Sequence, residues 1–412
     1  MAQIQRAISD DIFRHIAQAY GTPIFVYDEN GIRSRIKNLN QAFNWAKVYV
    51  NYFAVKATPT PAILRIMADE GLGFDCSSLS ELQLITESDL LKSKLFFTAN
   101  NVSDEDYYQA HSRGAIINLD KLADLENILK VLPDVPQTMS IRYNPGQSII
   151  GSNSILGNPK YSKFGDSKAN VLIALKRMQS AGVTNIGLHS MLVSNQVHVS
   201  GFEQTAQYLK NLILEVSHKL GLKINFVNLG GGLGMNYQHK DQPVNLQAIS
   251  QAIKNILGDL DIPIYTEFGR YITASNGYLL TRITHSPITS HQTFLPVDTS
   301  VNNLNRLATV DDAYHELSIL GEQTLSETIP MTVVGSMCTD TDKLFSNRLL
   351  PKNTKKGDLL VIHDVGAHGR ADATNYNGSL RCGEVIVQID NTCRLIRRHE
   401  TIDDLLATTE DF

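Results

Sequence analysis

The feature that most constrains this chain is an eightfold alternation of short apolar runs with amphipathic segments, between about residues 48 and 268. The runs are rich in Val, Ile, Leu and Phe, which is typical of strands buried on both faces of a sheet. They cover Val48–Ala57, Gly73–Ser77, Leu95–Ala99, Ala115–Leu119, Met139–Asn144, Ile186–Leu192, Phe226–Leu229 and Ile264–Phe268. The clearest helix between them is predicted over 202–220, where the apolar residues fall on one stripe.

Eight strand–helix units in succession predict an α/β fold, a (β/α)8 barrel of the TIM type. A doubly wound open sheet would give the same local alternation. The eight units follow one another without a break in composition, and this favours the barrel.

Beyond about residue 280 the helical periodicity fades and strand-like runs predominate, for example at Thr293–Val297 and Asp358–Ile362. This change predicts an all-β C-terminal domain. The first 45 residues carry a strand of their own, Pro23–Tyr27, which is expected to pack with the β domain. The predicted organisation is therefore an N-terminal segment over 1–45, a barrel over 46–280 and a β domain over 281–412.

Composition argues against several kinds of partner. The 412 residues include 37 Lys and Arg against 42 Asp and Glu, so neither nucleic acid nor an anionic membrane is expected as a partner. The apolar runs are too short for a membrane span, and the polar N-terminus lacks an apolar signal core. The four cysteines show no CxxC spacing, which fits a reducing compartment. We therefore expect a cytoplasmic protein that acts on a small molecule.

A lysine stands at the end of the first predicted strand, in FAVKA at 53–57. In a parallel barrel the active site forms at the carboxyl ends of the strands, so this position is a candidate. Burying an ammonium group costs free energy, which makes a lysine in a buried strand unusual. Either Lys56 extends to the rim of the barrel, or it is a desolvated amine suited to Schiff-base chemistry.

Glycines and charged groups follow the last two predicted strands. The segment NLGGGLG at 228–234 places three glycines at a strand-to-helix junction, where backbone N–H groups can close on a phosphate. The segment TEFGR at 266–270 puts a carboxylate and a guanidinium in one turn. With Lys56, these groups suit pyridoxal 5'-phosphate better than a nicotinamide or a metal. No dinucleotide fingerprint follows a first strand, and no metal-ligand spacing occurs.

An ordered set of motifs resembles the fold-type III family of pyridoxal-phosphate enzymes, the alanine-racemase-like barrels. Within it the chain resembles the branch of ornithine, diaminopimelate and arginine decarboxylases, over about residues 20–400. The motifs are FAVKA at 53–57, GFDCSSLSEL at 73–82, SKFG at 162–165, GLHSM at 187–191, NLGGGLG at 228–234, TEFGR at 266–270, DAYHEL at 312–317, VVGSMCTDTD at 333–342, GDLLVIHDVGAHG at 357–369 and NYNGSLRCGE at 375–384.

The resemblance implies a role for each matching residue. Lys56 would hold the cofactor as a Schiff base. Glu267 would bond the pyridine nitrogen and keep it protonated, so that the ring accepts electrons when CO2 leaves. Cys338 would enter from the partner subunit as a proton donor, which implies a homodimer with shared active sites. The other cofactor contacts would come from Asp75, Arg142, Ser194, Gly231, Gly232, Arg270 and Tyr376.

Four positions depart from the common pattern of the family. Met191 stands where a histidine often stacks on the cofactor ring, and its polarisable sulfur can fill the same space. His368 stands where a phosphate-binding tyrosine is common, and imidazole can still donate one hydrogen bond. Cys338 is followed by Thr339 instead of a glutamate, and Arg306 lacks the tyrosine that accompanies it in the family. Substrate contacts are expected at Arg306, Thr339, Asp342 and Tyr376.

The resulting prediction is pyridoxal-phosphate-dependent decarboxylation of an amino acid at its α-carbon. The first candidate substrate is meso-diaminopimelate, which would give L-lysine. The changes at 306 and 339 affect recognition of the distal group, so another amino acid or a diaminopropionate-containing siderophore intermediate stays open. A third hypothesis is a non-catalytic homologue with a regulatory role. The presence of Lys56, Glu267 and Cys338 argues against it.

Overall fold

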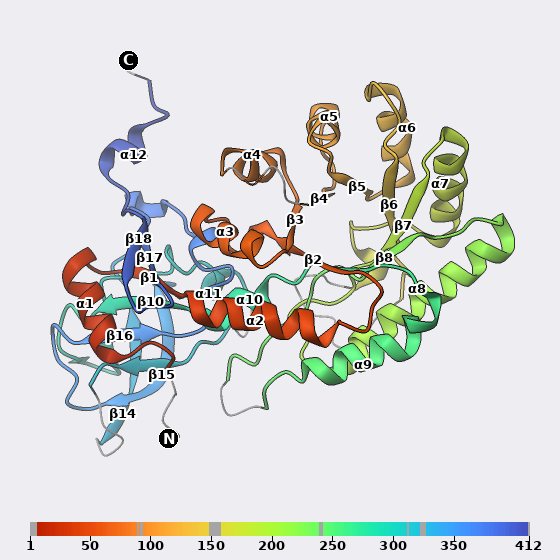
Figure 1. Cartoon of the computed structure of the whole chain (residues 1–412). Coiled ribbons are helices and arrows are strands. Elements are labelled where there is room, and N and C mark those ends of the chain that lie inside the picture. Colours follow the sequence, from red (N-terminus) through yellow and green to blue (C-terminus); the bar gives the residue numbers. More distant parts are fainter. Residues whose placement is uncertain are drawn as a thin grey trace. The chain divides into compact units, whose positions relative to one another are not determined.

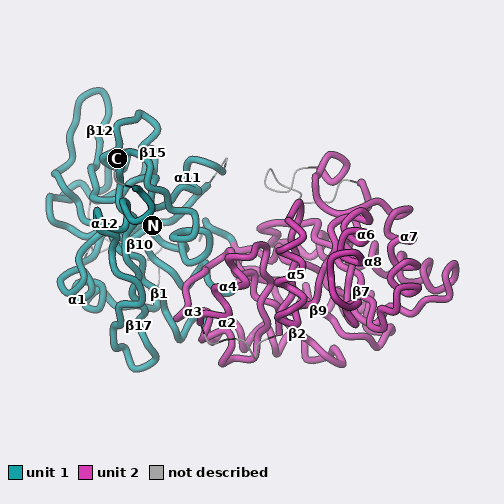
Figure 2. Tube along the Cα trace, turned by 90° about the horizontal axis from the view of Figure 1, so that it is seen from above, with its two compact units in different colours: residues 1–32, 236–242, 272–412 teal, residues 33–235, 243–271 magenta. Residues whose placement is uncertain are grey.

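The computed structural model describes residues 6–88, 90, 94–147, 158–238, 242–310, 313–321 and 327–410. The first residue of the DAYHEL motif, Asp312, lies outside these ranges. The chain forms two compact units, coloured separately in Figure 2. One, here named the β unit, comprises residues 1–32, 236–242 and 272–412, and the other, the barrel unit, comprises 33–235 and 243–271. The chain passes from the β unit to the barrel unit after residue 32 and returns after residue 271. Both positions lie somewhat earlier than the expected domain boundaries at 45 and 280.

The barrel unit contains a closed barrel of eight parallel strands, which confirms the predicted (β/α)8 architecture (Figure 1). The strands are β2 (Tyr49–Ala54), β3 (Gly73–Cys76), β4 (Leu95–Thr98), β5 (Ile116–Leu119), β6 (Thr138–Arg142), β7 (Asn185–His189), β8 (Phe226–Asn228) and β9 (Ile264–Thr266). The helices of this part of the chain are α2 (Glu29–Ala42), α3 (Pro61–Asp69), α4 (Leu79–Glu87), α5 (Asp104–Ser112), α6 (Leu122–Val131), α7 (Lys168–Ala181), α8 (Val199–Leu220), α9 (Leu246–Leu257) and α10 (Arg270–Thr273). The barrel closes where β2 pairs with β9, Val50 opposite Tyr265.

The interior of the barrel is filled by a layer of aromatic rings. Tyr52 lies 5.1 Å from Phe96 and 5.3 Å from Tyr265, measured between ring centroids, and Phe226 lies 5.0 Å from Tyr265. Glycine makes room for these rings, because a Cβ at Gly187 would stand 2.2 Å from the ring of Phe226. Alternate residues of each strand face the interior. The residue two positions further on therefore forms the next layer, towards the carboxyl ends of the strands.

The β unit contains two sheets. The six-stranded sheet has the order β13-β16-β10-β1-β17-β18, and the four-stranded sheet has the order β11-β12-β14-β15. Their strands are β1 (Ile24–Asp28), β10 (Gly277–Arg282), β11 (Ile288–Thr289), β12 (Thr293–Pro296), β13 (Leu317–Ile319), β14 (Thr328–Val334), β15 (Lys343–Pro351), β16 (Leu359–Ile362), β17 (Gly383–Val387) and β18 (Cys393–Arg397). Three helices accompany them: α1 (Asp10–Tyr20), α11 (Arg306–Thr309) and α12 (Ile402–Leu406).

The N-terminal strand β1 lies in the middle of the six-stranded sheet. It pairs antiparallel with β10 and parallel with β17, so that Ile24 is opposite both Leu280 and Gly383. Helix α1 contributes Phe13 and Ile16 to the apolar core on this sheet. The first strand of the chain thus shares its core with strands that follow some 250 to 370 residues later.

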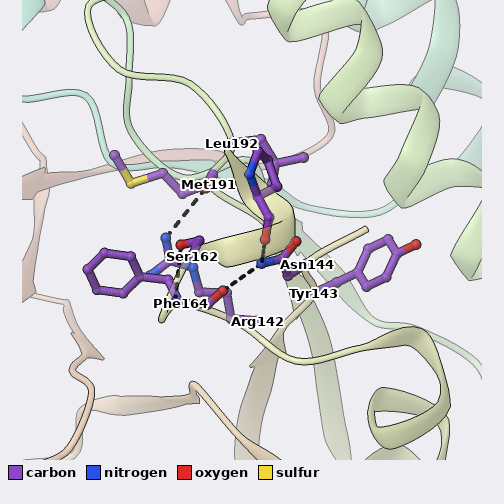
Figure 3. Close-up of a pocket in the computed structure, with 8 residues that line it drawn as sticks. Arg142, Tyr143, Asn144, Ser162, Phe164, Met191 and Leu192 are labelled. Carbon is purple, nitrogen blue, oxygen red and sulfur yellow. Dashed lines mark hydrogen bonds between the residues drawn. The ribbon is translucent and has the colours of Figure 1, made fainter. Parts of the chain in front are cut away.

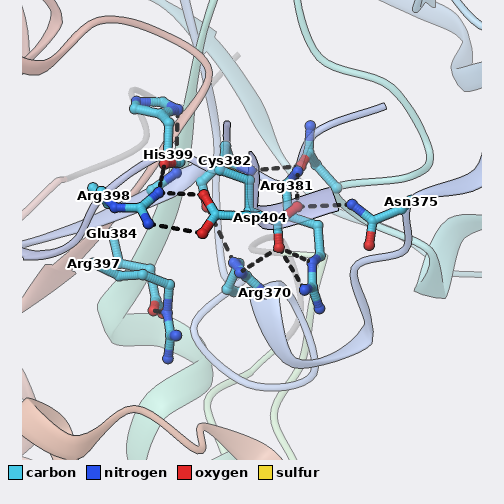
Figure 4. Close-up of polar contacts among 12 residues, drawn as sticks. Arg370, Asn375, Arg381, Cys382, Glu384, Arg397, Arg398, His399 and Asp404 are labelled. Atoms are coloured by element: carbon cyan, nitrogen blue, oxygen red, sulfur yellow. Dashed lines mark hydrogen bonds and ion pairs between the residues drawn. The ribbon is translucent and has the colours of Figure 1, made fainter. Parts of the chain in front are cut away.

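Ion pairs fasten the end of the chain to this sheet (Figure 4). Glu384 on β17 is fully buried and accepts hydrogen bonds from the Tyr27 hydroxyl at 2.8 Å and from Arg397. Burial and this carboxylate raise the pKa of Tyr27 well above its usual value. The next residue along the chain, Arg398, pairs with Asp404 and so ties the end of β18 to α12.

The predicted helix over 202–220 corresponds to α8, which buries Phe202, Leu209, Leu212 and Val216. Helix α8 ends at Gly221, whose left-handed conformation (φ 60°) suits glycine. Within the described ranges, no helix combines the length and apolar character that a membrane span requires.

Candidate active site

A polar layer lies directly above the aromatic layer, at the carboxyl ends of the barrel strands. Side chains on one face of a strand recur every second residue. Thr98, Asn228 and Glu267 come two residues after the rings of Phe96, Phe226 and Tyr265. Asp75 and His189 come two residues after Gly73 and Gly187, which make room for the rings. Asp75, Asn228 and Glu267 are at most 4% exposed, and His189 is fully buried. The strands thus bring together ionisable groups that are far apart in the sequence.

Glu267 is the best-connected carboxylate of this layer. The side-chain amide of Asn228 donates a 2.8 Å hydrogen bond to Oε1 of Glu267, and Nε2 of His189 lies 3.2 Å from the same oxygen. Burial opposes ionisation, but His189, Lys56 and Arg142 together outweigh it, so the pKa of Glu267 lies below its usual value. Glu267 is therefore ionised at neutral pH.

The turn that carries Glu267 is anchored to β2. Oδ1 of Asn51 accepts the backbone N–H of Phe268 at 2.8 Å, and its Nδ2 donates to the carbonyl of the same residue at 3.1 Å. Asn51 is 1% exposed, so these bonds are shielded from water. Sequence reasoning missed Asn51, Asn228 and His189, although the alternation of inward-facing residues is a signal that could have found them.

The pKa of Asp75 is shifted in the opposite direction to that of Glu267. Burial and the charge of Glu267 raise the pKa of Asp75 well above its usual value, although Lys56 acts in the other direction. Oδ1 of Asp75 has no hydrogen-bond partner among the described residues. The pKa values of two carboxyl groups in one site are thus shifted in opposite directions. One of them, Asp75, has an oxygen without a hydrogen-bond partner among the described residues.

Lys56 lies outside the strand in which the sequence placed it. Strand β2 ends at Ala54, and Lys56 occupies a 3-10 turn, Val55–Ala57, with its side chain exposed. The predicted position of Lys56 within a buried strand is therefore wrong, because the residue lies just beyond β2 and is exposed. Its Schiff-base role stays a prediction. The ammonium still acts on the pKa values of Asp75, Glu81 and Glu267, which places it near all three carboxyl groups.

The glycine-rich turn after β8 has no room for side chains. Gly232 has φ 94°, and a Cβ there would stand 2.3 Å from the carbonyl oxygen of Val193. The turn pairs with the segment that holds the predicted Ser194, because the N–H of Gln196 donates to Gly232 O at 2.8 Å. Ser194 is 8% exposed, and Arg270 begins helix α10 after the Glu267 turn.

A small pocket lies beside Arg142 at the ends of β6 and β7 (Figure 3). Its lining residues are Arg142, Tyr143, Asn144, Pro159, Ser162, Phe164, Met191 and Leu192. The guanidinium of Arg142 lies 4.7 Å from the ring centroid of Phe164, and its Nη2 donates to the Met191 carbonyl at 3.4 Å. Asn144 holds the loop in place by donating to the carbonyls of Pro159 and Phe164. The structure thus places the predicted Arg142 and Met191 side by side.

In the β unit, the predicted Cys338 lies in the exposed loop between β14 and β15. Its backbone N–H donates to the side chain of Asn377 at 3.4 Å, which brings the loop next to Tyr376, a residue 64% exposed. Asp342 is buried within the loop, where its oxygens accept the N–H groups of Val301 at 2.9 Å and Met337 at 2.8 Å. These contacts favour a structural role for Asp342 over the expected substrate contact.

Arg306 is also held by its own unit. It is 7% exposed, and its guanidinium lies 4.5 Å from the ring centroid of Tyr237. His315 donates from Nδ1 to the carbonyl of His363 at 2.8 Å, so its Nε2 can accept from Arg306 Nη1 at 3.3 Å. The predicted His368 is half-buried, with φ 55°, and Thr339 lies beside Thr341, 2.9 Å apart between hydroxyl oxygens.

The arrangement in the barrel unit defines an enzyme class, the (β/α)8-barrel enzymes that bind pyridoxal phosphate. Residues 29–274 match the family described as "Pyridoxal-dependent decarboxylase, pyridoxal binding domain". The chain belongs to the fold-type III pyridoxal-phosphate-dependent decarboxylases, in the ornithine, arginine and diaminopimelate decarboxylase family. It is thus an amino-acid carboxy-lyase of that family, and pyridoxal phosphate is its cofactor.

Relatives align with the chain over almost its whole length. Protein TabA of Pseudomonas amygdali pv. tabaci is 34% identical over 393 residues, 94% of this chain and 91% of that protein. Diaminopimelate decarboxylase of Neisseria meningitidis serogroup A is 30% identical over 401 residues, 96% of each chain. The crystal structure of diaminopimelate decarboxylase from Helicobacter pylori, complexed with L-lysine, superimposes with a TM-score of 0.88 at 25% identity, covering 96% of this chain and 98% of that one.

Proposed function

We propose that this chain decarboxylates an amino acid that carries a second polar group, with meso-diaminopimelate as the first substrate and L-lysine as the product. The observation that carries the proposal is the ionised, buried Glu267 within electrostatic reach of Lys56. Diaminopimelate decarboxylases similar to the chain over its whole length support the choice of substrate.

The residues present fit the cofactor. Bound pyridoxal phosphate supplies an electron sink for the bonding pair that CO2 leaves on the α-carbon. Lys56 would hold the cofactor covalently through its amine. Glu267 would bind the ring nitrogen and keep it protonated, which a carboxylate of lowered pKa can do. The phosphate would be bound by backbone N–H groups of Gly231 and Gly232, together with Ser194 and Arg270.

Asp75, Arg142 and Met191 would orient the amine and the ring. The free oxygen of Asp75 is a hydrogen-bond site for the amine of Lys56. Arg142 is fixed by Phe164 and the Met191 carbonyl, so its position is set before a ligand arrives. The Met191 side chain would contact the ring, and His368 would donate one hydrogen bond to the phosphate.

Cys338 is proposed as the proton donor to the α-carbon, acting from the partner subunit of a homodimer. Its exposure and that of Tyr376 support this proposal, because groups that complete a neighbour's site must be accessible on the free chain. Mixing Lys56→Ala with Cys338→Ala protein tests it. Each mixed dimer would contain one intact site, so about a quarter of the wild-type activity should return, since half of the dimers are mixed. If no activity returns although the dimers exchange subunits, the site is not shared.

A second candidate function is decarboxylation of a different substrate, including a conjugated amine. Arg306 favours it, because a guanidinium that is buried against Tyr237 and His315 is not presented to a distal carboxylate. Thr339 favours it as well, because no carboxylate follows Cys338 to bind a distal ammonium group. The chain is 34% identical to Protein TabA and 30% identical to the diaminopimelate decarboxylase of Neisseria meningitidis, so identity does not select diaminopimelate as the substrate.

The test is CO2 release and product identification with pyridoxal phosphate and a panel of diamino acids, with Lys56→Ala as the control. Formation of L-lysine from meso-diaminopimelate by the wild type alone supports the first candidate. If the cofactor binds and only another amine in the panel loses CO2, the second candidate replaces it. Absence of cofactor binding to the wild type would contradict both.

A further inference from the structure

His189 is a buried imidazole for which the reaction proposed above has no role. It is the last residue of β7 and is fully buried. Its Nε2 lies 3.2 Å from Oε1 of Glu267, within hydrogen-bonding distance, whereas Nδ1 has no hydrogen-bond partner among the described residues. Burying unsatisfied polar atoms costs free energy, and an apolar side chain would fill this space at lower cost. The imidazole therefore calls for an explanation other than packing.

Three side chains contact the same carboxylate oxygen of Glu267, Oε1. Asn228 at 2.8 Å, His189 at 3.2 Å and the Thr98 hydroxyl at 3.5 Å all approach Oε1. Three contacts on one oxygen fix the rotation of the carboxylate and turn Oε2 away from these side chains. Since Oε1 is an anionic acceptor, Nε2 of His189 carries the hydrogen that faces it.

We propose that His189 is a positioning residue for Glu267: its Nε2–H holds Oε1 and thereby presents Oε2 to the ring nitrogen of the cofactor. This inference rests on the proposed role of Glu267. His189 acts through that carboxylate and does not itself touch the ring. Its effect should therefore depend on whether the cofactor has a ring nitrogen.

The test compares the binding of pyridoxal phosphate with that of its 1-deaza analogue, in which carbon replaces the ring nitrogen. The quantity of interest is the nitrogen preference, the Kd of the analogue divided by the Kd of pyridoxal phosphate. His189→Leu should lower this preference by about tenfold, the effect of losing one charge-assisted hydrogen bond. In Glu267→Gln protein, adding His189→Leu should lower it no further, because both changes remove the same interaction.

Two amide variants separate positioning from packing. The amide nitrogen of glutamine can take the place of Nε2, and that of asparagine takes the place of Nδ1, which faces no partner in the described residues. His189→Gln should thus retain the nitrogen preference and His189→Asn should lose it, even if the leucine variant fails to fold. Ser190→Ala is the matched control, because Ser190 is equally buried but bonds the Tyr143 carbonyl at 2.9 Å.

The outcomes are distinguishable. A reduced preference in the leucine and asparagine variants alone supports the inference. If both Kd values rise by the same factor in these variants, or neither changes, His189 only packs. If the wild type binds both compounds equally, Glu267 does not bind the ring nitrogen. If the wild type binds neither, the proposed function fails and the inference fails with it.

Discussion

One buried amide, Asn228, joins the carboxylate of Glu267 to the glycine-rich turn. Its Nδ2 donates to Glu267 Oε1 at 2.8 Å, and its Oδ1 accepts the N–H of Gly230 at 2.8 Å. The proposed sites for the ring nitrogen and for the phosphate are therefore coupled through a single side chain.

Replacing this amide should weaken cofactor binding. Asn228→Asp keeps the acceptor for Gly230 but turns a second oxygen towards Glu267, which converts a hydrogen bond into a repulsion. We expect about tenfold weaker binding of pyridoxal phosphate, measured by absorbance titration. Asn225→Asp is the control, because Asn225 precedes the same strand and accepts the N–H of Ile186 at 3.0 Å, at the other end of the barrel. Equal losses in the two variants would contradict the coupling.

The turn should not tolerate a side chain at Gly232. Gly232→Ala combines a positive φ with a Cβ that would stand 2.3 Å from Val193 O, so we expect a loss of about 3 kcal/mol in the free energy of unfolding. Gly182→Ala has a similar φ of 101° at the end of α7 but nothing within 4 Å of the new Cβ, and should cost about 1 kcal/mol. Urea denaturation of both variants checks the difference. Equal costs would mean that conformation alone requires glycine at 232.

The raised pKa of Asp75 predicts a pH dependence of the cofactor-free protein. Because the folded chain binds this proton more tightly than the unfolded chain, the group stabilises the fold below the ordinary aspartate range. That contribution declines as the pH rises towards the raised pKa. Asp75→Asn removes the titration, so its stability relative to the wild type should increase with pH, as followed by denaturation at several pH values.

Asp259 provides a control, because replacing it should change the stability in the opposite direction as the pH rises. It is exposed, and its hydrogen bonds to Lys210 lower its pKa, so it favours the folded state above the ordinary aspartate range. Asp259→Asn should therefore become slightly less stable than the wild type as the pH rises. A pH-independent difference between Asp75→Asn and the wild type would show that Asp75 is ionised in the folded chain.

The stability of the loop that carries Cys338 should depend on the hydrogen bonds that Asp342 accepts. Asp342→Ala leaves the N–H groups of Val301 and Met337 without their acceptor. We therefore expect the free energy of unfolding to fall by about 3 kcal/mol. Asp342→Asn retains one acceptor oxygen and should lose less. Faster hydrogen exchange of these two amides in the alanine variant would identify the cause. Unchanged exchange together with a raised KM would restore Asp342 as a substrate contact.

Much of the fold was predictable, because a buried parallel barrel requires short apolar strands to alternate with amphipathic helices along the sequence. All eight strands lie within or close to their predicted ranges. Seven of them end earlier at the active-site end, and β5 ends at Leu119 as predicted. At that end the chain turns to deliver side chains, as at Lys56 and Met191, and local hydrophobicity does not reveal where pairing stops. The strands β11, β13, β15 and β18 were missed, since strands of a half-exposed sheet carry mixed residues.

The candidate site was predictable only where residue type alone suggests chemistry. Lys56, Glu267 and the glycines belong to that group. Asn51, Asn228 and His189 act through contacts between different strands of the barrel. Arg306 was assigned to the substrate by the family resemblance, because the sequence does not reveal that its guanidinium packs on Tyr237 and bonds His315. Such partnerships depend on strand register and side-chain direction, which a single sequence does not supply.

The place of β1 at the centre of the six-stranded sheet determines when this sheet can be completed during synthesis of the chain. Strand β1 is synthesised before every strand of the barrel, but its partner β17 begins only at residue 383. The barrel strands, which end at residue 266, emerge well before that partner. In a nascent chain the β17 side of this strand, with Ile24 and Val26 that are fully buried in the finished sheet, therefore stays unpaired until β17 has been made. A chain that stops short of β17 would keep that edge open, and open strand edges favour aggregation.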